Sequence, residues 1–165
     1  MNKMFCFQCE QTAGCKGCTG SAGVCGKSAN TANLQDKLTG ALIGLARAVE
    51  GNEELVTPDT NRLVLEGLFT TITNVNFDDE SIAALTEKVS TEKSRFVPNC
   101  ACCPSACGRT HDYDMKQVWE ADEDIRSLKS LILFGIRGVA AYAYHAALLG
   151  YSDEDLNRFC YKALS

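Results

Sequence analysis

Five of the ten cysteines lie in one glycine-rich run near the amino terminus, and their spacing could build a metal centre. Two residues separate Cys6 from Cys9, eight separate Cys9 from Cys18, and six separate Cys18 from Cys25, with Cys15 left over inside the loop. Cysteine thiolates are the usual protein ligands of iron–sulfur clusters. Because glycines let such a short segment fold back on itself, four of these thiolates can converge on one centre.

Three kinds of site fit this run when only the spacing is considered. Iron–sulfur clusters and structural zinc accept the same four thiolates. Disulfides are the weaker choice, because the first seven of the 165 residues lack the apolar stretch and cleavage site of a signal peptide. The spacing favours an iron–sulfur cluster over zinc, and zinc over disulfides or free thiols.

The overall composition is that of an ordinary globular protein, with 45% hydrophobic residues, 22% charged residues and a net charge of −5. No basic run suggests nucleic acid. The longest apolar run, residues 128–149, is interrupted by Lys129, Arg137 and His145, which predicts a buried bundle helix and no membrane span. Ten cysteines without an export signal indicate a reducing, cytoplasmic location.

Apolar residues recur every three or four positions along most of the remaining chain, which predicts an all-α fold. We expect an antiparallel helical bundle preceded by an irregular cysteine-rich loop that binds the cluster. A single domain, 1–165, would comprise a cluster loop (1–29), first helices (30–95), a cysteine-containing connector (96–120) and C-terminal helices (121–165). The expected helix starts are Asn30 or Thr31, Pro58–Asp59, Asp78–Asp79, Asp122–Glu123 and Ser152.

The connector holds a second cysteine group, and the sequence gives it no clear task. The group could form another metal site or a vicinal-disulfide switch. Its crowded spacing instead favours free thiols in a loop. The four cysteines are Cys100, Cys102, Cys103 and Cys107. No role is assigned to Cys160. His145, Trp119 and Tyr142 are interpreted as packing residues, with His145 partly buried against a carbonyl. Gly135 and Gly138 would allow close approach of a neighbouring helix or of the cysteine loop.

The cysteine run also carries a resemblance to a known family. The stretch MFCFQCEQT at 4–12, with GCT at 17–19 and GVCGK at 23–27, resembles the amino terminus of the hybrid cluster proteins, also called prismane proteins or hydroxylamine reductases. Further likeness lies at 31–36, 67–78, 123–128 and 138–142. The resemblance implies that the cluster ligands are Cys6, Cys9, Cys18 and Cys25, with no counterpart for Cys15. It favours [4Fe–4S] over [2Fe–2S] or zinc.

The resemblance implies that the complete enzyme is an oxidoreductase. In it, a small redox protein reduces the amino-terminal cluster. Electrons then pass to a hybrid iron–sulfur–oxygen cluster, held by later domains, where hydroxylamine or nitric oxide is reduced. No residue of this chain matches the ligands of that second cluster. We therefore expect an electron-entry domain that is inactive alone, has the remaining domains as partners, and could form a homodimer. The alternative is a zinc-stabilised helical binding module without redox activity.

Overall fold

The computed structural model describes residues 4–6, 17–97 and 111–165. Within these ranges the chain is helical and contains no strand, which confirms the predicted all-α class. The elements are α1 (Ala29–Val49), η2 (Glu53–Leu55), α2 (Pro58–Thr70), α3 (Asp79–Ser94), α4 (Lys116–Trp119), α5 (Glu123–Leu148) and α6 (Glu154–Leu164).

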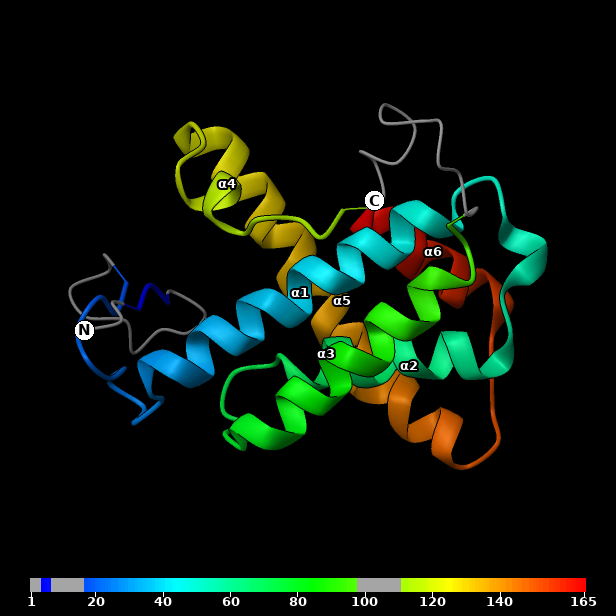
Figure 1. The fold of residues 1–165 in the computed structure, drawn as a ribbon, viewed down its shortest axis with the longest axis horizontal. Helices are drawn as coiled ribbons and strands as arrows, with labels where there is room; N and C mark the ends of the chain where they lie inside the picture. The colour runs from blue at the N-terminus through cyan, green and yellow to red at the C-terminus, as the bar shows by residue number, and fades with distance from the viewer. Residues whose placement is uncertain (1–3, 7–16, 98–110) are drawn as a thin grey trace.

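Helix α1 is the centre of the molecule, and α2, α3 and α6 all pack against it (Figure 1). The chain reverses between α1 and α2 and again between α2 and α3, so that α1 and α3 run in the same direction side by side. Side chains at the two helix starts join them, because Asn30 Nδ2 and Thr31 Oγ1 each donate to the Asp79 carboxylate at 2.7 Å. The amino-terminal ends of both helices therefore meet at the end of the bundle where residues 17–28 lie.

Most helix starts agree with the sequence prediction, and two do not. Pro58 begins α2 and Asp78 caps α3, as expected. The cap of α1 is Ser28, whose side chain accepts from the Thr31 N–H, so the predicted cap, Asn30 or Thr31, was two or three residues too late. The cap of α6 is Asp153 and not Ser152. Each replacement cap is one of the residue types that best bind a free N–H of the first turn.

Close helix contacts in the core depend on glycine in α1 and α2. The core residues Leu38, Leu42 and Leu45 are completely buried. A Cβ on Gly67 of α2 would lie 2.8 Å from Leu42 Cδ2, and one on Gly40 of α1 would fall on the Tyr113 carbonyl oxygen. The segment 111–115 therefore lies directly on α1.

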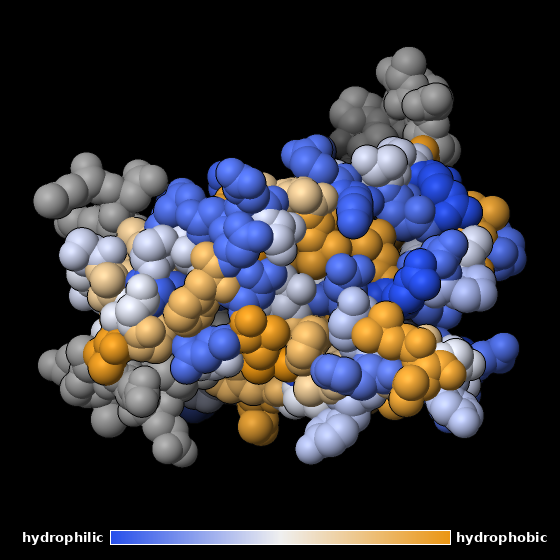
Figure 2. All heavy atoms as spheres, turned by 90° about the horizontal axis from the view of Figure 1, so that it is seen from below, coloured by the Kyte–Doolittle hydropathy of each residue, from blue (hydrophilic) through white to orange (hydrophobic). Residues whose placement is uncertain are grey.

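Helix α5 differs from its prediction as a buried bundle helix. Ile136 and Ala140 are buried, but Leu128 and Leu131 are 59% and 70% exposed. No atom outside α5 lies near the positions of a Cβ on Gly135 or Gly138, so their predicted close packing is wrong for the described residues. Large hydrophobic side chains thus reach the surface, as Figure 2 shows in patches on the face seen from below.

By length and composition alone, α5 could cross a membrane, and it is the one described helix for which this holds. Its apolar window has a mean hydropathy of 1.4, and 22% of that window is buried inside the structure. The buried side of the helix contains Arg137, whose guanidinium donates to two threonine hydroxyls of the bundle. The helix therefore has one side fixed to the bundle and another side that the described residues leave open.

Candidate functional site

Three of the four predicted ligands lie in the described part of the chain: Cys6, Cys18 and Cys25. Cys9, Cys15 and the second cysteine group, Cys100, Cys102, Cys103 and Cys107, lie outside the described residues. The site is therefore built from three thiols and the side chains around them. Within the described residues, no disulfide joins these three thiols to one another.

Cys6 and Cys18 are held directly opposite each other by two backbone hydrogen bonds. The Cys6 N–H donates to the Cys18 carbonyl at 3.0 Å, and the Cys18 N–H donates to the Cys6 carbonyl at 2.6 Å. Residues paired in this way in antiparallel backbone have neighbouring Cβ atoms on the same face. The fold therefore presents these two thiols side by side, although eleven residues separate them in the sequence.

A tight turn at residues 23–27 brings Cys25 close to the side chains that pack around Cys6 and Cys18. The Gly23 N–H donates to the Lys27 carbonyl at 2.8 Å and the Gly26 N–H donates to the Gly23 carbonyl at 2.9 Å. At the position of a Cβ on Gly23, the nearest atoms are Cys25 Sγ at 3.5 Å and Met4 Cε at 3.6 Å. Met4 in turn packs with Cys18. Cys25 therefore lies on the same small cluster of side chains as the paired thiols.

Two glycines are needed for this arrangement. Gly17 has φ of +92° directly before Cys18, and Gly26 has φ of +86° directly after Cys25. This left-handed region disfavours every residue with a Cβ. At Gly17 a Cβ would also lie 3.0 Å from the Phe5 ring and 3.3 Å from the Cys6 carbonyl oxygen. The glycine-rich composition of the run is explained, at these two positions, by the turns that orient the thiols.

Beneath the thiols lies a buried lysine. Lys27 is 1% exposed. Its ammonium donates to Gln35 Oε1 at 2.6 Å and lies 4.0 Å from Cys6 Sγ. Gln35 is itself fixed, because its Nε2 donates to the Asn76 carbonyl at 2.9 Å. A positive charge is therefore held beside a candidate metal ligand by a hydrogen-bonded chain that crosses from the loop to α1 and the turn before α3.

A second buried cation comes from α5. Arg137 is 4% exposed, and its guanidinium donates to Thr71 Oγ1 at 2.9 Å and to Thr39 Oγ1 at 3.0 Å. Burial lowers the pKa of Arg137 to about 10, although negative charge at Asp36 and at Cys6 acts in the opposite direction. Arg137 therefore stays charged at neutral pH, with Cys6 within its electrostatic reach.

Asp36 is within electrostatic reach of both cations, and burial is the largest influence on its pKa. Loss of solvent raises the pKa of Asp36 from 3.8 to about 7, against the lowering effect of Arg137 and Lys27. Asp114 raises this pKa and the Trp119 side chain lowers it. No described carboxylate forms an ion pair with Lys27 or Arg137. A carboxyl with this pKa is only partly ionised near neutral pH, so it offsets only part of the positive charge of Lys27 and Arg137.

These features fit an anionic iron–sulfur cluster. Thiolates are its usual ligands, and a cluster bound by four of them carries net negative charge. The two buried cations, together with the amino terminus of the 21-residue α1 directly after the loop, favour negative charge at this place. A zinc ion bound by four thiolates would also be anionic, so the charge pattern alone does not separate these two centres. Within the described residues, no three cysteine, histidine, aspartate or glutamate side chains lie close enough together to hold a metal ion, and this includes Cys6, Cys18 and Cys25.

Sequence reasoning missed Lys27, Gln35, Asp36 and Arg137. The signal for Arg137 was present, since it is a single charge in a long apolar run, but it was used only as an argument against a membrane span. A single charge in an apolar run can also mark a cation that is buried against the other helices of the bundle. Lys27, Gln35 and Asp36 stand in the stretches 23–27 and 31–36 that carry the family resemblance, but the resemblance gave them no individual role.

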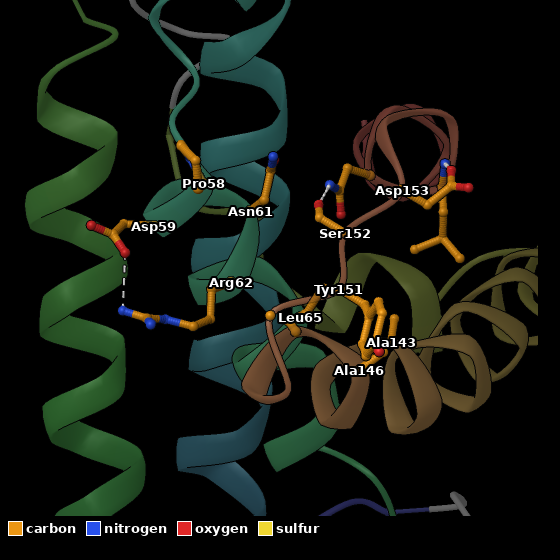
Figure 3. A pocket seen from close by; sticks show the side chains of 14 residues that line it. Pro58, Asp59, Asn61, Arg62, Leu65, Ala143, Ala146, Tyr151, Ser152 and Asp153 are labelled. Carbon is orange, nitrogen blue, oxygen red and sulfur yellow. Dashed lines mark hydrogen bonds and ion pairs between the residues drawn. The ribbon is translucent and has the colours of Figure 1, made fainter.

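A cavity and a histidine elsewhere in the described chain are separate from the three thiols. A pocket of about 340 Å³ lies between the start of α2 and the end of α5, at the far end of the molecule from the cysteine loop (Figures 1 and 3). Figure 3 shows Asp59 and Arg62 pointing toward one another at its edge, where they form a 3.0 Å ion pair. His145 is exposed and bonds the Ala141 carbonyl at 2.6 Å, so the carbonyl contact was predicted correctly but its burial was not.

Trp119 and Cys160 have packing roles, and Tyr142 does not. Trp119 packs on Phe5, beside Cys6, with ring centroids 5.5 Å apart, as a packing residue would. Tyr142, predicted to pack, is 84% exposed. Cys160 is 1% exposed in the main core, where burial raises the pKa of its thiol to about 11. A buried protonated thiol behaves as a small hydrophobic side chain, so Cys160 is a core residue.

Comparison with known proteins gives a consistent result. The chain matches the Prismane/CO dehydrogenase family over residues 4–165. Hydroxylamine reductases of Porphyromonas gingivalis, Methanococcus vannielii and Thermoanaerobacter pseudethanolicus are 41%, 38% and 40% identical to it over 180, 182 and 190 residues. These alignments cover 98% of this chain but only 32%, 33% and 33% of the relatives. The chain therefore spans about a third of the length of the curated relatives it matches.

Proposed function

The chain belongs to the Prismane/CO dehydrogenase family, and from this premise we propose that it is the iron–sulfur electron-entry part of a hydroxylamine reductase. The relatives that carry this name are oxidoreductases that match nearly the whole chain. The observation that supports the proposal best is the corner where Cys6 and Cys18 lie side by side above buried Lys27. The proposed ligands are Cys6, Cys9, Cys18 and Cys25, and the proposed cofactor is [4Fe–4S].

The residues of the chain have distinct tasks in this proposal. The paired backbone of Cys6 and Cys18 fixes two thiols, and the Gly23–Lys27 turn places a third. Met4 and Cys18 pack with Ala29 and Ala32 at the start of α1, which keeps water from the inner side of the site. The buried side chains of Lys27 and Arg137 supply positive charge on the protein side of Cys6. When bound, an iron–sulfur cluster takes up and releases single electrons, and solvent exposure and nearby hydrogen bonds set its potential.

The proposal places the substrate-reducing centre outside these 165 residues. A cluster ligated by four thiolates has no open position for hydroxylamine, so electron entry by itself does not reduce the substrate. The chain spans about a third of the length of its relatives, and the open side of α5 offers a surface for the remaining polypeptide. Leu128, Leu131 and Tyr142 are 59%, 70% and 84% exposed there. The proposed partners are therefore these further parts of the enzyme and a small redox protein that donates electrons.

Anaerobic reconstitution with iron and sulfide tests the proposed cofactor. We expect broad visible absorption that dithionite bleaches. A colourless protein that binds one zinc ion and shows no bleaching would instead support the zinc-stabilised binding module and would contradict the proposal.

A turnover assay tests the proposed division of labour. Reduced methyl viologen is the electron donor, hydroxylamine is the substrate, and Cys9→Ser serves as the control for loosely bound iron. We expect the reconstituted chain to match this control. Sustained oxidation of the viologen above the control would show that an open iron site exists within the 165 residues.

A further inference from the structure

Lys27 is an unusual lysine because its charged end is inside the protein. The residue is 1% exposed, and no described carboxylate forms an ion pair with it. Burial of an ammonium without a counter-ion costs several kcal/mol, on the order expected for any isolated buried charge. A protein that needed only the apolar stem of this side chain could use methionine or leucine without that cost. The position therefore requires an explanation in terms of charge.

The surroundings of the ammonium fix its direction. Gln35 Oε1 accepts its hydrogen bond at 2.6 Å, and the Phe77 ring centroid lies 6.0 Å away. Gln35 is completely buried and is held by the Asn76 carbonyl. These partners are neutral, so they orient the ammonium without cancelling its charge. The ammonium also lies 4.0 Å from Cys6 Sγ and within electrostatic reach of the Asp36 carboxyl, with which it forms no ion pair.

We propose that Lys27 is a charge-compensating residue that raises the reduction potential of the cluster bound through Cys6. This inference rests on the proposed function. Uptake of one electron makes a thiolate-bound cluster more negative by one charge. A cation fixed beside a ligand stabilises that reduced form more than the oxidised form, and low solvent access strengthens the effect. Arg137, which also lies within electrostatic reach of Cys6, would act in the same direction from α5.

Substitutions that change charge with little change of shape test the assignment. Lys27→Met keeps the stem and removes the charge, whereas Lys27→Arg keeps the charge. Gln35→Glu places a carboxylate at the bonded neighbour and neutralises the ammonium without removing it. The matched control is Lys37→Met, because Lys37 is also a lysine and lies on α1 but is exposed.

The measurement is a potentiometric titration of the reconstituted chain, followed by visible absorption and by the electron paramagnetic resonance of the reduced cluster. Dithionite supplies one electron to each cluster and is oxidised to sulfite. We expect Lys27→Met and Gln35→Glu to lower the midpoint potential, with about a tenfold change in the redox equilibrium, or 59 mV for a one-electron couple. Lys27→Arg and Lys37→Met should retain the wild-type potential within a small fraction of that shift.

The possible results separate this inference from the proposed function. Absence of iron from the wild-type chain would refute the proposed function itself. A normal cluster whose potential is the same in Lys27→Met, Gln35→Glu and wild type would overturn the inference alone. If both variants fail to fold while Lys37→Met folds, Lys27 serves folding and the inference is also overturned. A lower potential in both variants, with rescue by Lys27→Arg, supports it.

Discussion

Gly40→Ala is the substitution that the packing of this chain should tolerate least among its helical glycines. Gly40 lies in the middle of α1, and the Tyr113 N–H donates to its carbonyl at 3.0 Å. A Cβ at this position would fall on the Tyr113 carbonyl oxygen and would lie 3.2 Å from its carbon. These are backbone atoms, so no side-chain rotation can relieve the contact. The segment 111–115 must move away from α1.

The expected cost follows from three terms. Overpacking against backbone costs about 1–3 kcal/mol, and loss of the Tyr113–Gly40 hydrogen bond costs about 1 kcal/mol. The higher helix propensity of alanine relative to glycine stabilises the folded chain by up to about 1 kcal/mol. We therefore expect Gly40→Ala to lower the free energy of unfolding by about 1–3 kcal/mol. Gly138→Ala is the matched control, because no atom outside its helix is near, and should raise that free energy by up to about 1 kcal/mol.

Urea unfolding of the metal-free chain, followed by far-ultraviolet circular dichroism, measures both variants. The displacement has a second reporter, because Trp119 is the single tryptophan and follows the displaced segment. Movement of this segment should loosen the contact of Trp119 with Phe5 and shift its fluorescence emission to longer wavelength. A Gly40→Ala chain as stable as Gly138→Ala, with unchanged emission, would refute the placement of 111–115 on α1.

The remaining predictions concern charge and the open side of α5. Burial raises the pKa of Asp36 from 3.8 to about 7, so between these values the folded chain binds more protons than the unfolded chain, and this group makes stability fall as pH rises. Asp36→Asn should thus stabilise the chain more at pH 8 than at pH 4, by at most about 4 kcal/mol in urea unfolding; an equal effect at both pH values would contradict the raised pKa. Leu131→Glu should change the free energy of unfolding by less than about 0.5 kcal/mol, whereas Ile136→Ala should cost about 2–5 kcal/mol. Similar losses for both would mean that α5 has no open side.

The helices could be predicted from the sequence because their signals are local. Apolar residues at helical spacing identified the long helices, and Pro58 and Asp78 marked two starts correctly. The start of α1 was misplaced because Ser28, Asn30 and Thr31 are all competent caps, and the spacing does not rank them. The short helix α4, Lys116–Trp119, was not predicted, since four residues carry too little periodicity.

The side that each α5 residue faces could not be predicted, because it depends on which neighbours are present. Apolar residues lie on both sides of this helix, so periodicity marked a helix without marking its buried face. Glycines show the same limit. Gly135 and Gly138 had the same sequence signal as Gly40, yet only Gly40 lies under another segment. The corner beneath the thiols was missed for this reason too, because it is assembled from the loop, α1, the turn before α3, and α5.

The central claim is that four particular thiols of the amino-terminal run hold one iron–sulfur cluster. Its most direct test is the iron and acid-labile sulfide content of the anaerobically purified and reconstituted chain, compared with single serine variants of five cysteines. The account predicts about four iron and four sulfide per chain. It predicts retention in Cys15→Ser and loss in each of the four ligand variants, at Cys6, Cys9, Cys18 and Cys25. Loss of the cluster in Cys15→Ser, together with full occupancy in Cys18→Ser, would contradict it.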